Sequence, residues 1–181
     1  VSGARTPVLR EVLAYSVSPD GARVAYAKLA RTGGEAFEIV PLAGGSPETL
    51  VDPAERLAPF NSPDYSPAGD SIAFASADQT QAPVIPTPAG GLRGGIRPRG
   101  GFGAPPADGL PQDIWTVPAD GGRPVRVADL KEDLPALTWN GDGTKIYVLG
   151  VAGLYEVDIE NGATTRIGEG TFHGQITWTG E

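Results

Sequence analysis

The sequence of 181 residues predicts an all-β fold built from a repeated four-stranded unit. Two kinds of tight turn support this prediction. A turn of the Pro/Asp/Gly type recurs, as SPDG at 18–21, SPAGD at 66–70 and NGDG at 140–143, and a glycine turn follows each copy. The 26 glycines and 18 prolines lie mostly at these spaced turns, which is typical of all-β proteins with many short strands.

The residues around the first kind of turn predict a β-hairpin. A large or β-branched residue precedes each copy, and an alternating strand follows it, as in Val24/Tyr26, Ile72/Phe74 and Ile146/Val148. A period of two is the pattern of a strand with one buried face. The predicted core consists of these and similar apolar positions: Val24, Tyr26, Tyr65, Ile72, Phe74, Ile114, Val117, Trp139, Ile146, Val148 and Trp178.

A second hairpin follows each of the first three, at 39–51, 116–128 and 156–168. Its Gly-Gly or Asn-Gly dipeptide supplies the positive φ that short hairpin loops require. The positions before the first turns (Val17, Tyr65, Trp139, Trp178) are 48, 74 and 39 residues apart. Without an insertion in the long interval, this period approaches the roughly 40–45 residues of a propeller blade. A β-sandwich is disfavoured, because the two kinds of turn recur three times in the same order.

The SPDG turn, the alternating strand after it and DIWTVPADGG at 113–122 together resemble the repeat of TolB-type β-propellers. This repeat is found in periplasmic TolB, in many secreted bacterial proteins and in propeller domains attached to prolyl-oligopeptidase-like peptidases. The resemblance covers nearly the whole chain except 77–111. It implies a propeller fold, whereas function has to be argued from sites.

We therefore expect one domain over 1–181, an arc of about three four-stranded antiparallel blades with partial blades at both ends. Residues 5–12 would form the last strand of a preceding blade, and residues 175–181 the first strand of a following one. Propellers typically have four to eight blades, and each repeat relies on its neighbours to bury its core. Either the chain belongs to a longer propeller, or several copies complete one another.

Residues 77–111 form a Gly/Pro/Arg-rich insertion between the second and third strands of the middle unit. Because strands alternate in direction, we expect the insertion on the face opposite the SPDG and glycine turns. Three interpretations of the insertion remain open. It is a loop without a partner, it binds single-stranded RNA through its Arg-Gly-Gly triplets, or it is an arm that packs on a neighbouring subunit or ligand. Arginine and aromatic residues are enriched at interfaces. The candidate partner-binding residues of the insertion and the apolar last segment are Arg93, Arg97, Arg99, Phe102, Ile176 and Trp178.

Charge and composition exclude several classes of function. The net charge of −8 disfavours nucleic acid and anionic membranes as partners, and no apolar run approaches the roughly 18 residues of a membrane helix. The chain has no cysteine, one histidine (His173) and no G-x-S-x-G motif. Most zinc sites, Cys–His dyads and an oligopeptidase triad are thereby excluded. We interpret the turn aspartates as turn chemistry, and expect no catalytic residue, cofactor or metal site.

These observations favour a non-enzymatic, secreted or periplasmic propeller that acts as a protein-binding or scaffold module, through self-association or further blades. The absence of methionine, even at position 1, is consistent with a processed, extracytoplasmic protein. The alternative is the propeller domain of a larger hydrolase of the prolyl-oligopeptidase-like class. A gene that encodes only further blades would favour the first hypothesis, and a downstream α/β-hydrolase segment the second.

Overall fold

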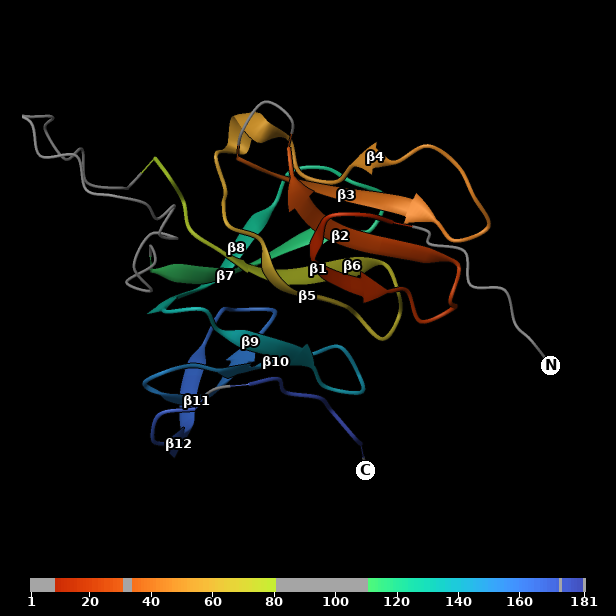
Figure 1. Cartoon of the computed structure of the whole chain (residues 1–181). Coiled ribbons are helices and arrows are strands. Elements are labelled where there is room, and N and C mark those ends of the chain that lie inside the picture. The colour runs from red at the N-terminus through yellow and green to blue at the C-terminus, as the bar shows by residue number, and fades with distance from the viewer. Residues whose placement is uncertain (1–8, 31–33, 81–110, 173, 181) are drawn as a thin grey trace, which may run out of the picture.

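The computed structural model describes residues 9–30, 34–80, 111–172 and 174–180. These residues form three four-stranded antiparallel sheets, which we term the first, second and third blade (Figure 1). The first blade contains β1 (Val12–Val17), β2 (Arg23–Leu29), β3 (Glu35–Pro41) and β4 (Glu48–Thr49). The second contains β5 (Asn61–Tyr65), β6 (Ser71–Ser76), β7 (Gln112–Pro118) and β8 (Val125–Glu132). The third contains β9 (Ala136–Trp139), β10 (Lys145–Leu149), β11 (Gly153–Asp158) and β12 (Thr164–Glu169).

Each blade is a meander in which the strands lie side by side in sequence order. A short 3-10 turn, η1 (Pro53–Glu55), lies between the first and second blades. The first strands of the blades are neighbours, since β1 contacts β5 and β5 contacts β9. This arrangement confirms the predicted all-β propeller arc with four strands in each repeat.

Hydrogen bonds within the turns explain why aspartate recurs there. In the first blade the Asp20 carboxylate accepts hydrogen bonds from the Ser18 hydroxyl (2.6 Å) and the Ala22 amide (2.9 Å). In the third blade Asp142 accepts from both the hydroxyl and the amide of Thr144. These bonds hold the pKa of Asp20 and of Asp142 below the ordinary value, because they favour the ionised carboxylate. The interpretation of these two aspartates as turn residues is confirmed.

The turns of neighbouring blades touch one another on one face of the arc. A Cβ atom on Gly69 would lie 3.3 Å from Cδ of Pro19, and a Cβ on Gly143 would lie 3.5 Å from Cδ of Pro67. The β1–β2, β5–β6 and β9–β10 turns accordingly lie together at the right-hand side of Figure 1. The predicted common face of the three SPDG-like turns is confirmed.

Neighbouring blades pack large apolar residues of one sheet against alanines of the other. Two alanines of β2 lie in one core cluster with the large apolar residues of β6, and two alanines of β6 lie in another with those of β10. Small residues on one sheet let the large residues of the next approach closely, so that the interface is packed as densely as a core. All of these side chains are completely buried: Ala25, Ala27, Ile72, Phe74, Ala73, Ala75, Ile146 and Val148.

The predicted core is confirmed at every position except Trp178, which is 40% exposed. The expected strand at 175–181 is also absent from residues 174–180, and at the other end β1 begins only at Val12. A strand forms where a neighbour satisfies its main-chain hydrogen bonds, and no described strand pairs with 174–180 or with 9–11. The positive φ of Glu11 (58°) also interrupts an extended chain before β1.

The size-matched interface makes a prediction about Ala73, which has no exposed surface. Ala73→Leu should lower the free energy of unfolding by about 1–3 kcal/mol, because the larger side chain overpacks the contact with Ile146 and Val148. Ala43→Leu, the same change at an exposed turn residue, should alter it by less than about 0.5 kcal/mol. Urea denaturation of both variants measures the difference, and equal stabilities would contradict the proposed packing.

Candidate functional site

The first strands of the three blades surround a hollow of about 530 Å³. Each of β1, β5 and β9 is the end strand of its sheet, so one edge of each has no partner among the described strands. Residues of all three strands line the hollow, and residues 174–177 form a further part of its wall. The meander topology therefore leaves one edge of each innermost strand without a strand partner at one cavity, where side chains of the preceding strand bind the Tyr65 and Trp139 amides.

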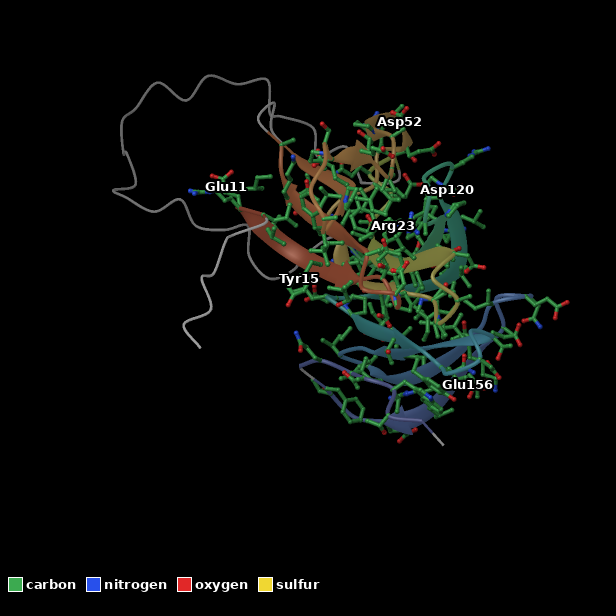
Figure 2. The ribbon with its side chains drawn as sticks, turned by 90° about the vertical axis from the view of Figure 1, so that its right-hand side faces the viewer. Glu11, Tyr15, Arg23, Asp52, Asp120 and Glu156 are labelled. Carbon is green, nitrogen blue, oxygen red and sulfur yellow. The ribbon has the colours of Figure 1, made fainter. Side chains whose placement is uncertain are left out.

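The lining of the hollow is mainly polar, with an apolar border on β1. Ser16, Asn61 and Thr138 contribute uncharged polar side chains, and Asp64 is the one acidic or basic side chain in the described lining. On β1, Leu13 and Tyr15 are 53% and 65% exposed, which is unusual for apolar residues of a strand at the centre of a fold. Figure 2 shows Tyr15 at the lower border of the first blade, on the side of the third blade.

Asp64 joins the second blade to the third. Its carboxylate oxygen Oδ2 accepts hydrogen bonds from the Thr138 hydroxyl (3.0 Å) and the Trp139 amide (3.1 Å). The indole Nε1 of Trp139 donates to the main-chain oxygen of Asp64 (3.0 Å). Burial raises the pKa of Asp64 above the ordinary 3.8, although these hydrogen bonds favour the ionised form. The carboxylate thus positions the third blade.

The first and second blades are joined by an equivalent contact. Ser16 occupies in β1 the position that Asp64 occupies in β5, one residue before the end of the strand. Its hydroxyl oxygen accepts a hydrogen bond from the Tyr65 amide (3.2 Å). A side chain of β1 therefore binds the main chain of β5, and a side chain of β5 binds the main chain of β9, which fixes the spacing of these strands around the hollow.

A β-bulge in β5 shapes the wall between these contacts. The register of β5 with β6 shifts between Asn61 and Asp64, and Ser62 between them has a positive φ of 46°. Bulges bend a strand and redirect its side chains, and they recur beside functional sites. Asn61 anchors the bulge, because its amide nitrogen donates to Oε1 of the buried Gln112 (3.0 Å).

The turn face carries a shallower, charged depression. Arg23 donates from Nη1 to the main-chain oxygen of Ala119 (3.2 Å), and Asp70 and Asp120 lie beside it in a hollow of about 350 Å³. Figure 2 looks onto this face and shows Arg23 close to Asp120. In the described ranges of the chain, no group of three or more acidic or histidine side chains is placed to hold a metal ion. No helix in those ranges has the length and hydropathy of a membrane span.

Comparisons with known proteins identify the fold. The sequence matches no protein-family model, and no curated protein matches it. The structure resembles TolB from Acinetobacter baumannii, with a TM-score of 0.60 and 17% identity over 92% of this chain and 35% of that one. A putative TolB from Agrobacterium tumefaciens has a TM-score of 0.56 and 21% identity, over 86% of this chain and 45% of that chain.

The chain has a TolB-like β-propeller fold. A puromycin-hydrolyzing peptidase of Mycobacterium tuberculosis is also similar, with a TM-score of 0.56 and 19% identity over 90% of this chain and 24% of that chain. The TolB-like chain thus spans 35% and 45% of the two TolB structures. At these identities the likeness establishes the fold, and the site has to be argued from the residues themselves.

Of the partner residues predicted from the sequence, the structure describes two, Ile176 and Trp178. Ile176 lines the hollow and is half-buried, and Trp178 stacks on Tyr147 with ring centroids 5.4 Å apart. The candidates Arg93, Arg97, Arg99 and Phe102 lie outside the described residues, and so does His173. The hypotheses about the insertion therefore stay predictions.

Sequence reasoning missed Tyr15, Ser62 and Asp64 as residues of the hollow. One signal was present in the sequence, because the position before Val17, Tyr65 and Trp139 is polar in all three repeats. A polar residue in each innermost strand indicates a recurring contact at that position. The bulge at Ser62 has no comparable signal, since it depends on how β5 pairs with β6.

The raised pKa of Asp64 predicts a pH-dependent stability. The folded protein holds this proton more tightly than the unfolded chain, so the contribution of Asp64 to stability falls as the pH rises from 3.8 through the raised pKa. Asp64→Asn removes this dependence and retains an acceptor oxygen. The free energy of unfolding of the variant minus that of the wild type should therefore increase over this pH window and then level off. Urea denaturation at a series of pH values measures the difference, and a constant or decreasing difference would contradict the raised pKa.

Proposed function

We propose that this TolB-like arc is a non-enzymatic protein-binding module that accepts an extended polypeptide segment in the hollow. The observation that supports the proposal is that β1, β5 and β9 each have one edge without a described strand partner at one cavity. Edge strands bind extended peptides through main-chain hydrogen bonds, and nearby side chains select the sequence. The exposed Leu13 and Tyr15 provide apolar contact area at the border of the hollow, and tyrosine is enriched among residues that dominate binding energy.

The chemistry of the described lining supports binding over catalysis. Asp64 accepts two hydrogen bonds from the third blade through one carboxylate oxygen, and no other acidic side chain, histidine, lysine or arginine lies in the described wall. General acid–base catalysis needs a positioned group whose proton is free to move to a substrate. The use of Asp64 as a contact between blades favours a structural role for the carboxylate.

A second hypothesis is that the chain is the propeller part of a larger hydrolase. The similarity to the Mycobacterium tuberculosis peptidase favours it, because this chain covers 24% of that enzyme. The full gene distinguishes the two hypotheses. A segment with a G-x-S-x-G nucleophile motif would support the hydrolase, whereas further propeller repeats alone would support the binding module.

Two finer hypotheses accompany the proposal. We propose an extracytoplasmic location, which the TolB-type repeat supports and the lack of cysteine permits. Self-association through Ile176 and Trp178 stays a prediction, supported by the 40% exposure of Trp178. Light scattering tests it, since association requires a mass that is a multiple of the chain's 18.6 kDa, and a monomer at all concentrations would contradict it.

Peptide display tests the proposed binding site. Random peptides selected on the wild-type chain should bind Tyr15→Asp at least about tenfold more weakly, equivalent to roughly 1.4 kcal/mol, because a charge replaces apolar contact area beside the hollow. Val125→Asp is the matched control, since Val125 is 61% exposed on the outer strand β8. Peptides that lose affinity equally for both variants, or for neither, would contradict binding in the hollow.

A further inference from the structure

The same stretch of each repeat lines the hollow. In each stretch, the residue directly before the large residue of the repeat belongs to the lining. This residue carries a hydroxyl in three of the four stretches, as Ser16, Thr138 and Thr177. In the remaining stretch it is Asp64. A carboxylate therefore lies in the wall at a position where the repeat otherwise has a hydroxyl.

The contact between blades does not require this charge. The Ser16 hydroxyl accepts a hydrogen bond from the amide of the next innermost strand (3.2 Å), and Asp64 makes the same kind of contact with the Trp139 amide (3.1 Å). Burial raises the pKa of Asp64, because the ionised carboxylate loses water contacts in the fold. A hydroxyl at this position would avoid that cost, so the carboxylate indicates a role beyond the packing of the blades.

Asp64 has no cationic partner in the hollow. No lysine, arginine or histidine belongs to the lining that the structure describes. Both hydrogen bonds from the third blade end on Oδ2, which leaves Oδ1 without a partner in that blade. Asp64 is half-buried, and a carboxylate in such surroundings is stabilised by a cation that also donates hydrogen bonds.

The rest of the lining indicates which kind of cation fits. Leu13 and Tyr15 are exposed at the border of the hollow, and Leu137 also lines it. Lysine and arginine side chains pack their methylene stems on apolar surface and place their charged ends at polar groups. A calcium ion needs six to eight oxygen ligands, roughly, and usually several carboxylates. Since Asp64 is the one carboxylate in the described lining, an organic cation fits better than a metal ion.

The turn face favours the approach of a cation. Asp64 is the last residue but one of β5, and the turns that follow β1 and β9 at the same end carry Asp20 and Asp142. Turn hydrogen bonds hold the pKa of both carboxyls below the ordinary value, so both are ionised at neutral pH. Arg23 and Lys145 of these hairpins are bonded to a main-chain oxygen and to a carboxylate, respectively. With a net charge of −8, the chain attracts cationic segments.

We propose that the hollow recognises a lysine or arginine side chain of the segment that it binds, through a charge-assisted hydrogen bond to Asp64. The inference rests on the proposed function and adds the chemistry that the segment must carry. Asp64 then has two roles, because Oδ2 positions the third blade and Oδ1 receives the cation. A segment with a neutral side chain at this point leaves the carboxylate unpaired and binds more weakly.

Peptide display tests the recognition of the charge. Random peptides selected on the wild-type chain should be enriched in lysine and arginine relative to the unselected library. Peptides selected on Asp64→Ser, which restores the hydroxyl of the other repeats, should lack this enrichment. Asp120→Ser is the matched control, because it removes the same charge from an exposed turn residue outside the described lining, and its peptides should remain enriched. Equal enrichment on the wild type and Asp64→Ser would overturn the inference.

A single selected peptide gives the size of the effect. Exchange of its lysine for norleucine, or of its arginine for citrulline, should weaken binding to the wild type at least about tenfold, because a charge-assisted hydrogen bond is lost. The same exchange should weaken binding to Asp64→Ser by less than about twofold. Isothermal titration calorimetry measures the four affinities, and an equal loss for both proteins would refute the pairing. If the serine variant does not fold, Asp64→Asn decides the question, since it keeps an acceptor oxygen and removes the charge.

Tyr15→Ala separates this inference from the proposed function, because it removes apolar contact area at the border without changing the charge. If it weakens the peptides while the lysine exchange costs the same with and without Asp64, the binding module stands and the recognition of a cation is refuted. If the cost of the lysine exchange depends on Asp64 but Tyr15→Ala has no effect, the cation site stands and binding along β1 is refuted. Peptides that respond to neither residue would overturn both.

Discussion

The fit of large apolar residues against alanine between blades is the contact on which the rest of the structure depends. Ile72 and Phe74 pack with Ala25 and Ala27, and this close approach of two sheets sets the distance between their first strands. Phe74 also contacts the Phe37 and Phe60 rings, at centroid distances of 5.3 and 5.6 Å, so that the interface extends along the blade. The hollow exists because the innermost strands of packed blades converge without pairing with each other.

The two outward faces of the arc differ from the interfaces inside it. On the first blade the Tyr26 hydroxyl donates to Glu38 (2.5 Å), and Lys28 lies 2.7 Å from the same carboxylate. The third blade has the corresponding set of residue types in Tyr147, Lys145 and Glu156. Satisfied polar groups reduce the apolar surface on each face. Burial raises the pKa of Tyr26, and the hydrogen bond to Glu38 raises it further, so the hydroxyl remains a donor at neutral pH.

The candidate site results from the packing between blades and from a few residues that depart from the repeat. Asp64, Ser16 and the bulge at Ser62 follow from the way in which one innermost strand holds the next. Tyr147 and Gly141 depart from the repeat where Trp178 packs. Because a propeller supports unrelated activities, such departures are better evidence of a specific role than the fold that the chain shares with TolB.

The sequence by itself determined the elements that depend on neighbouring residues. Alternation predicts the strand containing Ile72 and Phe74, and the hydrogen bonds of Asp20 close a turn within five residues of the chain. Only the tertiary structure decided the contacts between distant segments, such as the bond from Thr138 to Asp64 across 74 residues, and the stacking of Trp178 on Tyr147. The sequence predicts that Trp178 is a core residue, because its sequence context repeats that of Trp139. It is exposed because no described sheet covers its outer side, and burial depends on which surfaces meet in space.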